Sequence, residues 1–484
     1  MKSVKILSLL LAAIMTVAAF VSCNNGKMPG KESSGGEDTN QTDEIITSVK
    51  PQDYNGTEFN FLTIADQERF HKEIFVEAED TQEVIYASVY RRNDYVNNYL
   101  NIVINTTPSD TAYDTATTLI NSSDTTYDVY NLYKHGCISL ITQGYTRDWS
   151  ELNNINFENP WWNSSAFENL AVNGKIFLMS GSILITEIDD TLAMVYNKDI
   201  YNEYSSVLEY DIFDEVLGGT WTLDRFISMV TKVSADLNAD GEINVGDDLL
   251  GYATEPNSMA MNWPFACNFV HGTIKDGEYD MNVTSSTINN VTTMLEKLKS
   301  LFASDYADQS KQLDECVQMF TEGKSFITAI ILRNLESMRD MESDYGVIPY
   351  PKFDENQKDY ITHVGGASPI MVIPLQNTSD DERLGNILEA MCEASYRITR
   401  PAYYETALKE KGTRDEESKQ ILDLILDSRT YDLAYISASG LAWMIGGMIA
   451  AENDAFARQW QKQGERVQAT LQDLVDSIIE NNAY

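Results

Sequence analysis

Residues 58–65 read EFNFLTIA, an apolar run with β-prone Phe and Ile that predicts a strand. Residues 101–106 read NIVINT and predict a second strand. Between them the pattern has a helical period, with a helix start at residues 80–83 and one apolar face. That face consists of Ile85, Val89, Val96 and Leu100. Residues 128–133 (DVYNLY) again read as extended. The alternation of strand and helix predicts α/β units with largely parallel sheets.

The second half of the chain repeats these patterns. An apolar stripe of helical period runs from Val291 to Phe302, and residues 325–332 (SFITAIIL) have the length of a buried strand. Residues 379–382 (SDDE) form a capping box that opens a further helix. A long amphipathic helix is expected over 467–478, with Gly464 inside it or at its start. No tandem repeat at solenoid spacing is present.

Length and charge narrow the possible functions. The 484 residues correspond to two or three units of about 150 residues each. Hydrophobic residues make up 43% of the chain, which is enough for an ordinary buried core. Lys and Arg total 35 and Asp and Glu total 74, so the formal net charge is -39. Such a surface repels phosphate backbones and anionic membranes, which excludes nucleic-acid binding and charge-driven membrane binding.

The first 22 residues have the organisation of an export signal. Two lysines near the start precede an apolar run over 6–21, which is shorter than the ~20 residues that a membrane-spanning helix needs. Residues 20–23 (FVSC) resemble a bacterial lipobox, in which Cys23 becomes the lipidated first residue of the mature chain. The alternative is cleavage after a small residue, with an incidental Cys23 and a freely secreted protein. Residues 23–53 are then a lipidated Cys and a flexible Gly/Ser-rich tether.

The other four cysteines are far apart and form no CxxC pair, which argues against zinc and thioredoxin-like sites. They are Cys137, Cys267, Cys316 and Cys392. Four cysteines allow three pairings into two disulfides, but a large domain does not need them, so free thiols are favoured.

Residues 236–247 (DLNADGEINVGD) match an EF-hand-type calcium loop. Oxygen-bearing side chains fall at positions 1, 3, 5, 9 and 12, Gly falls at position 6, and Ile243 at position 8 is expected to hold the loop against the core. Position 12 is Asp247 rather than Glu, which predicts weaker binding, and Asp248 is an alternative ligand. A solvated acidic turn is the alternative to a structural Ca²⁺ site. The predicted ligands are Asp236, Asn238, Asp240, Glu242 (through its carbonyl), Asn244 and Asp247.

Catalytic motifs are missing from the sequence. Four His residues are present, and no HExxH, GxSxG, Walker loop or GxGxxG after a strand occurs. Acidic pairs such as Asp189-Asp190 are expected by chance among 74 acids, so they do not indicate glycosidase chemistry. We therefore expect a protein that is not an enzyme.

Several segments, in order, resemble the sugar-type bacterial extracellular solute-binding proteins (family 1), in the lipoprotein form common in Clostridia and relatives. The resemblance extends over most of residues 54–484. Its segments are 174–177 (GKIF), 191–199 (TLAMVYNKD), 219–224 (GTWTLD), 236–251, 345–352 (YGVIPYPK), 364–367 (VGGA) and 373–374 (IP).

This resemblance implies a two-lobed α/β fold of the type II periplasmic-binding-protein class, with a hinge between the lobes. One lobe would hold 54–188 and 346–395, and the other 189–345 and 396–484. It also implies a monomer that captures a sugar or oligosaccharide outside the cell and delivers it to an ABC transporter permease. A surface glycan-capture lipoprotein without a transporter, or an exported carbohydrate-active enzyme, are the alternatives.

Sugars bind by stacking on aromatic rings while carboxylates and amides hold their hydroxyls. Trp161 and Trp162, which follow Pro160, are a candidate stacking platform, although packing in the core explains them equally well. Trp443 and Asp190 match a late aromatic and an acidic hinge position of the family. The complete set of predicted ligand-binding residues is Trp161, Trp162, Asp190, Trp263, Tyr435 and Trp443.

Overall fold

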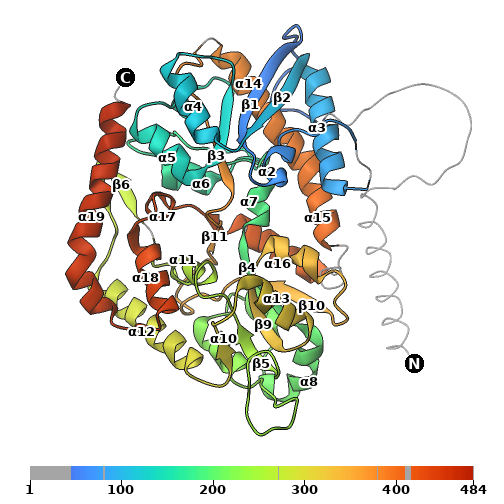
Figure 1. The fold of residues 1–484 in the computed structure, drawn as a ribbon, viewed down its shortest axis with the longest axis vertical. Helices are drawn as coiled ribbons and strands as arrows, with labels where there is room; N and C mark the ends of the chain where they lie inside the picture. Colours follow the sequence, from blue (N-terminus) through green and yellow to red (C-terminus); the bar gives the residue numbers. More distant parts are fainter. Residues whose placement is uncertain (1–44, 80–81, 271, 379, 409–415, 483–484) are drawn as a thin grey trace, which may run out of the picture. The chain divides into compact units, whose positions relative to one another are not determined.

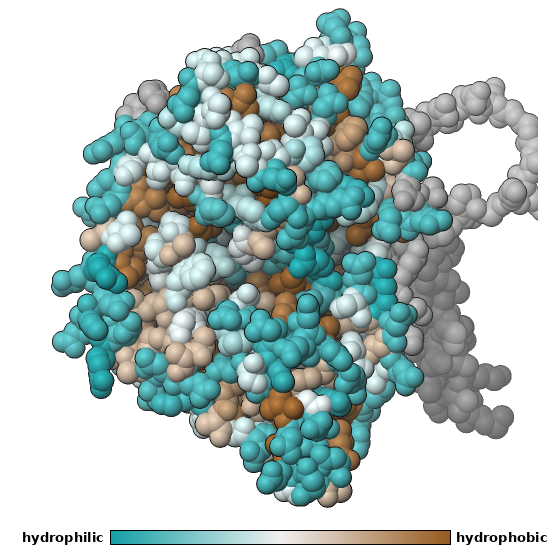
Figure 2. Space-filling model, in the orientation of Figure 1, coloured by the Kyte–Doolittle hydropathy of each residue, from teal (hydrophilic) through white to brown (hydrophobic). Residues whose placement is uncertain are grey.

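The computed structural model describes residues 45–79, 82–270, 272–378, 380–408 and 416–482. The predicted signal, Cys23 and the first part of the tether lie outside the described residues, as do residues 80–81 of the predicted helix start. The end of the predicted tether needs correction: Ile46 and Val49 are buried in the core, and the amides of Thr47 and Ser48 donate hydrogen bonds to Glu393, so residues 45–53 belong to the fold. No helix within the described ranges is long and apolar enough to cross a membrane. Hydrophilic side chains cover most of the face drawn in Figure 2, in keeping with the acidic composition.

The first sheet has four strands in the order β12-β3-β1-β2 (Figure 1). Its strands are β1 (Thr57–Ile64), β2 (Ile102–Ser109), β3 (Val129–Tyr133) and β12 (Pro369–Val372). β1 pairs in parallel with both β2 and β3, and β12 joins β3 antiparallel. The three strands predicted from 58–133 are therefore confirmed.

Helices cover both faces of this sheet, as expected when a parallel sheet is buried on both sides. On β1, Phe59 and Phe61 belong to one core cluster, while Leu62 and Ile64 belong to the other. The helices that pack in this part are α2 (Glu68–Lys72), α3 (Val84–Leu100), α4 (Ala112–Asn121), α5 (Lys134–Thr142), α6 (Ser164–Leu170) and α14 (Asp381–Ala394).

The second sheet has five strands in the order β10-β4-β9-β5-β8. They are β4 (Leu192–Asn197), β5 (Leu250–Ala253), β8 (Ala307–Asp308), β9 (Ser325–Ile331) and β10 (Tyr345–Ile348). β5 is parallel to β8 and β9, whereas β4 is antiparallel to β9 and β10. The buried strand predicted at 325–332 is thus the third strand of this sheet.

Two helices of the second part, at 285–302 and 456–481, follow the predicted periods. Its larger helices are α8 (Lys198–Leu208), α9 (Ile212–Leu217), α10 (Leu223–Val230), α12 (Ser285–Phe302), α13 (Leu313–Thr321), α16 (Glu416–Asp427), α18 (Gly440–Ala450) and α19 (Phe456–Asn481). Gly464 lies inside α19, where a Cβ would come 2.8 Å from the ring of Trp460. A glycine is therefore required there for packing.

Short elements connect the two sheets. They are α7 (Thr186–Asp189), η3 (Leu332–Met338), η4 (Ser395–Thr399), α15 (Arg400–Leu408), and the pair formed by β11 (Thr362–His363) and β13 (Arg429–Thr430). Smaller elements are η1 (Trp149–Glu151), η2 (Met259–Met261), α11 (Asn262–Ala266), β6 (Thr273–Lys275), β7 (Glu278–Asp280) and α17 (Leu433–Ile436).

Two predicted boundaries between the lobes need correction. β10 belongs to the second sheet because its backbone groups pair with β4, so the return to the first part comes after residue 348 rather than at 346. η4 and α15 pack on α3 of the first part, so residues 396–408 do not belong to the second part alone. The backbone N–H and C=O groups of a strand must form hydrogen bonds with a neighbouring strand, and for β10 that neighbour is β4 of the second sheet.

Two local predictions are refined by the structure. Ser379 of the predicted capping box lies outside the described residues, and Asp380 caps α14 by accepting a hydrogen bond from the Arg383 amide at 2.9 Å. The cysteines Cys137, Cys267, Cys316 and Cys392 are buried and free, as predicted.

Candidate functional site

The predicted ligand-binding residues lie in three different places. Trp161 and Trp162 line one cavity, Trp263 lies in the core, and Asp190, Tyr435 and Trp443 lie on or beside a third region. The sequence therefore identified side chains that the fold does not bring to a single site.

Trp161 and Trp162 are only 6% and 5% exposed. Their indole nitrogens donate hydrogen bonds to the two carboxylate oxygens of Glu389, at 3.0 and 2.6 Å. Glu389 on α14 thus fixes both rings, and burial raises the pKa of its carboxyl group. The two tryptophans line a cavity of about 530 Å³ rather than an open stacking platform.

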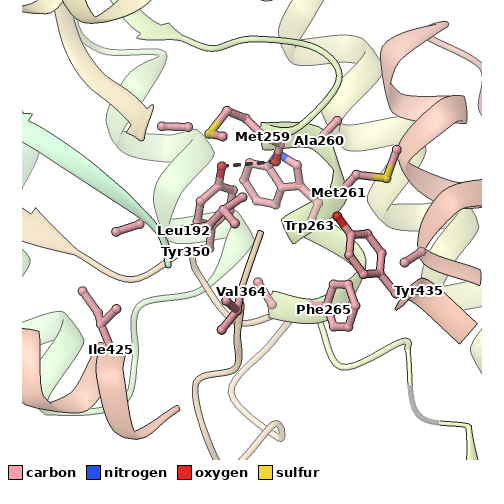
Figure 3. Close-up of a cluster of buried hydrophobic side chains, with 14 of the residues drawn as sticks. Leu192, Met259, Ala260, Met261, Trp263, Phe265, Tyr350, Val364, Ile425 and Tyr435 are labelled. Atoms are coloured by element: carbon pink, nitrogen blue, oxygen red, sulfur yellow. Dashed lines mark hydrogen bonds between the residues drawn. The ribbon is translucent and has the colours of Figure 1, made fainter. Parts of the chain in front are cut away.

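Trp263 is a core residue. Its side chain is 1% exposed and packs edge-on against Tyr350, with ring centroids 5.2 Å apart, and against Phe226 at 5.5 Å. Figure 3 shows it among Met259, Ala260 and Met261, enclosed by apolar side chains. The prediction that Trp263 binds ligand needs correction, because a ring so enclosed has no face left for a sugar.

Asp190 follows α7 and is 2% exposed. Arg69, from the helix that follows β1, pairs with Asp190 at 3.2 Å and with Asp189 at 3.4 Å. The backbone carbonyl of Asp190 accepts a hydrogen bond from the Gly365 amide at 2.8 Å. Its oxygen Oδ2 has no hydrogen-bond partner among the described residues, so it retains acceptor capacity.

Tyr435 and Trp443 form a stack, with ring centroids 5.4 Å apart and planes 16° from parallel. The indole nitrogen of Trp443 donates to the Tyr435 carbonyl at 3.0 Å, which holds the ring in place. Tyr435 packs in turn against His363 and Phe265, as the side chains in Figure 3 indicate for Phe265. Trp443 is 41% exposed, whereas the other six tryptophans are buried or partly buried.

Asp190 and the stack adjoin through the loop between β11 and β12. Gly365 bonds to Asp190, and a Cβ on Gly366 would lie 3.5 Å from the Tyr435 hydroxyl oxygen. The charge of Asp190 also contributes to the raised pKa of Tyr435, about 12, after burial as the main cause. These contacts place a carboxylate and an exposed aromatic ring in one region.

Three further residues belong to this region and were not predicted. Asp66 follows β1, Tyr133 is the last residue of β3, and His135 lies in the first turn of α5. The Tyr133 hydroxyl donates to the Asp66 carboxylate, and the rings of Tyr133 and His135 stack with centroids 5.7 Å apart. Burial and the Asp66 carboxylate raise the pKa of Tyr133. One signal could have identified these three residues: they follow or end parallel strands, and ligands usually bind at the carboxyl ends of such strands.

We call this region the Asp190–Trp443 face. It consists of Asp66, Arg69, Tyr133, His135, Asp190, Gly366, Tyr435 and Trp443. Asp66, His135, Gly366 and Trp443 are exposed on it. Trp443 also lines a groove of about 740 Å³ between α18 and α19. The face therefore offers an aromatic surface, carboxylates and a guanidinium group, which together suit a neutral polyhydroxylated molecule.

Asp432 caps α17, the short helix that carries Tyr435, by accepting a hydrogen bond from the Ala434 amide at 3.1 Å. Burial raises the pKa of its carboxyl group to about 6. The folded state therefore binds this proton more tightly than the unfolded state. The resulting stabilisation is complete below pH ~4 and is lost as the pH rises through about 6.

Asp432→Asn keeps the capping oxygen and removes the buried charge. We expect the variant to be more stable than the wild type at pH 8, by up to about 3 kcal/mol. The difference should shrink at pH 4.5, as measured by thermal unfolding at both pH values. Asp211→Asn, at the exposed cap of α9, is the matched control and should show no such gain. An equal effect of Asp432→Asn at both pH values would contradict the prediction.

In the loop at 236–247, the segment that precedes β5 in Figure 1, side-chain oxygens accept hydrogen bonds from the loop's own amides. Asp236 accepts hydrogen bonds from the amides of Asp240 and Gly241, and Asp240 accepts one from Glu242. Gly241 has φ +93, which allows the sharp turn. Ile243 packs on the cluster formed by Leu250, Ala253 and Met319, as predicted.

Asp248, which was considered as an alternative Ca²⁺ ligand, has a structural role in the loop. Its carboxylate is buried and accepts hydrogen bonds from the amides of Leu237 at 2.8 Å and Asn244 at 2.7 Å, so it ties the two ends of the loop together. Across the described parts of the chain, no three His, Cys, Asp or Glu side chains are grouped so as to hold a metal ion. The fit of the loop to Ca²⁺ therefore rests on its Asp, Asn and carbonyl oxygens together.

The sequence matches no protein-family model and no curated protein. Among solved structures, the chain is similar to a cyclo/maltodextrin-binding protein complexed with maltotetraose. The TM-score is 0.52 at 12% identity, over 88% of this chain and 97% of that one. A maltose/maltodextrin-binding domain, MalE from Bdellovibrio bacteriovorus bound to maltotriose, gives 0.48 at 14% identity, over 85% and 99%. The first likeness confirms the predicted two-lobed α/β fold.

Proposed function

We propose that this chain is a solute-binding protein that captures a carbohydrate on the Asp190–Trp443 face. The observation that carries the proposal is the exposed Trp443 ring, held flat on Tyr435, whose hydroxyl lies beside the loop that is bonded to Asp190. An exposed ring can stack on the apolar face of a sugar, and a ring that is already fixed loses little entropy on binding. The solved relative of the same fold was crystallised with maltotetraose.

The residues of the face have distinct roles in this proposal. Trp443 stacks on the apolar face of a sugar ring, and the free Oδ2 oxygen of Asp190 accepts a hydrogen bond from a sugar hydroxyl. Arg69 orients the Asp190 carboxylate through the ion pair at 3.2 Å. Closure of the two lobes around the sugar would exclude water from these contacts.

The proposal extends to the setting of the protein. An export signal followed by Cys23 would make it a lipid-anchored protein on the outer side of the cell membrane, with residues 24–44 as the tether of the folded part. We infer that it acts as a monomer without enzymatic activity and passes its ligand to an ABC permease. Recovery of the sugar intact after incubation distinguishes this function from a carbohydrate-active enzyme.

The first test is a thermal-unfolding screen of the chain without its signal against a panel of sugars. Binding to the folded state alone raises its stability by RT ln(1 + [L]/Kd), about 2.7 kcal/mol at a hundredfold excess over Kd. We expect a selective upward shift with one class of sugars, and recovery of that sugar uncleaved. A chain that no sugar stabilises would overturn carbohydrate as the ligand.

We further propose that the loop at 236–247 binds Ca²⁺ as a structural site. With Kd near 0.1 mM, as in extracellular modules, about 1 mM Ca²⁺ would add roughly 1.4 kcal/mol of stability. Removal of Ca²⁺ with EGTA should therefore lower the melting temperature of the wild type. Asp236→Ala should be insensitive to EGTA, while Glu158→Ala, an exposed acid elsewhere, should respond like the wild type. Equal EGTA responses in all three proteins would exclude a site in this loop.

A further inference from the structure

A polar cavity away from the Asp190–Trp443 face lies at Trp161 and Trp162. It has a volume of about 530 Å³, within the range of small-molecule pockets. Its walls come from the loop before α6, from α7, from η4 and α15, and from α16 and β13. None of its lining residues belongs to the Asp190–Trp443 face, so the two regions are distinct.

The wall of this cavity has unused hydrogen-bonding capacity. Glu187 and Thr399 both line it and are completely buried. Oε1 of Glu187 and Oγ1 of Thr399 have no partner among the described residues, although the second Glu187 oxygen bonds to Ser180. Buried polar atoms without partners are unfavourable, so a polar molecule in the cavity would compensate them.

The charges around the cavity nearly balance. Arg400 and Arg429 line it together with Asp423 and Asp427, and Arg400 lies 3.9 and 3.7 Å from those two carboxylates. Burial raises the pKa of the Glu187 carboxyl group. A cavity with both donors and acceptors and little net charge favours a neutral ligand over an ion.

The aromatic walls are rigid. Glu389 holds the indole nitrogens of Trp161 and Trp162, and Tyr396 lies with its ring 6.3 Å from that of Trp161. Arg400 covers the Tyr396 ring at 5.1 Å. Fixed aromatic edges beside hydroxyl, carboxyl and guanidinium groups match the mixed apolar and polar surface of a small polyol.

We propose that this cavity is a second binding site, for a neutral polyhydroxylated molecule of one or two sugar rings. The site is separate from the one in the proposed function, so a chain could have either without the other. Thr399 provides the sharpest variant, because its hydroxyl has no protein partner and Val has nearly the same shape. We therefore expect Thr399→Val to keep the fold and to remove a hydroxyl that has no partner among the described residues.

The test is equilibrium dialysis of the full chain with radiolabelled glucose and maltose, up to about 10 mM. It compares three proteins: the wild type, Trp443→Ala, which removes the ring proposed to bind sugar on the Asp190–Trp443 face, and the double variant that adds Thr399→Val. We expect one bound molecule to remain in Trp443→Ala, and its affinity to fall about fivefold with Thr399→Val. Ser164→Trp, at the exposed rim of the cavity, should block that molecule altogether.

The matched control is Thr146→Val, combined with Trp443→Ala in the same way. Thr146 is also buried with an unpartnered hydroxyl, but it does not line the cavity. If Trp443→Ala binds no sugar, the cavity holds only water. This result overturns the second site and supports the site on the Asp190–Trp443 face. A second molecule insensitive to both Thr399→Val and Ser164→Trp also overturns it. If Trp443→Ala changes nothing while Thr399→Val weakens binding, the proposed function fails and the second site stands.

Discussion

Trp443→Ala is expected to weaken binding of the recognised sugar by a factor of about 30 or more. A central aromatic residue of a binding site typically contributes 2–4 kcal/mol, measured here by isothermal titration with the sugar found in the thermal screen. Because the side chain is 41% exposed, its removal should cost the fold only about 1 kcal/mol, mainly the stack on Tyr435.

Phe167→Ala is the matched control for this result. Phe167 is 37% exposed and also stacks on another ring, that of Phe157 with centroids 5.5 Å apart, but it lies away from the Asp190–Trp443 face. The control should lose little stability and no affinity. If both variants bind the sugar like the wild type, Trp443 is not part of the site.

Trp263→Ala is expected to have the opposite profile. The ring is 1% exposed and fills the core between Phe226 and Tyr350, so truncation leaves a large cavity and should lower the free energy of unfolding by about 3–5 kcal/mol. Urea denaturation measures this loss. Protein that remains folded should bind sugar with unchanged affinity, because Trp263 does not reach the Asp190–Trp443 face.

Trp263→Phe separates loss of packing from loss of an aromatic ring. The smaller ring leaves a smaller cavity, so we expect a stability loss between that of Trp263→Ala and the wild type. If the protein that remains folded, in either variant, binds the sugar with lower affinity than the wild type, Trp263 contacts the ligand. This result would restore the prediction made from the sequence.

The contrast between Trp443 and Trp263 shows what a sequence does not contain. Both were predicted as ligand-binding residues, and nothing in their neighbouring residues separates an exposed ring from an enclosed one. Burial depends on which elements fold against a residue, and Phe226, Tyr350 and Trp263 are brought together from distant parts of the chain. Asp66, Tyr133 and His135 were missed for the same reason, since β1 and β3 meet only in the folded sheet.

The sequence by itself determined the elements and the class of fold. Periods of two and of 3.6 residues reflect which side chains face a core, so strands at 58–65, 101–106 and 325–332 and a helix at 291–302 were readable locally. The tertiary structure alone decided the assignment of β10 to the second sheet and the burial of Trp161, Trp162 and Trp263. It also decided the link from Asp190 through Gly365 and Gly366 to Tyr435, on which Trp443 stacks. These outcomes depend on contacts between residues far apart along the chain, which a local pattern does not encode.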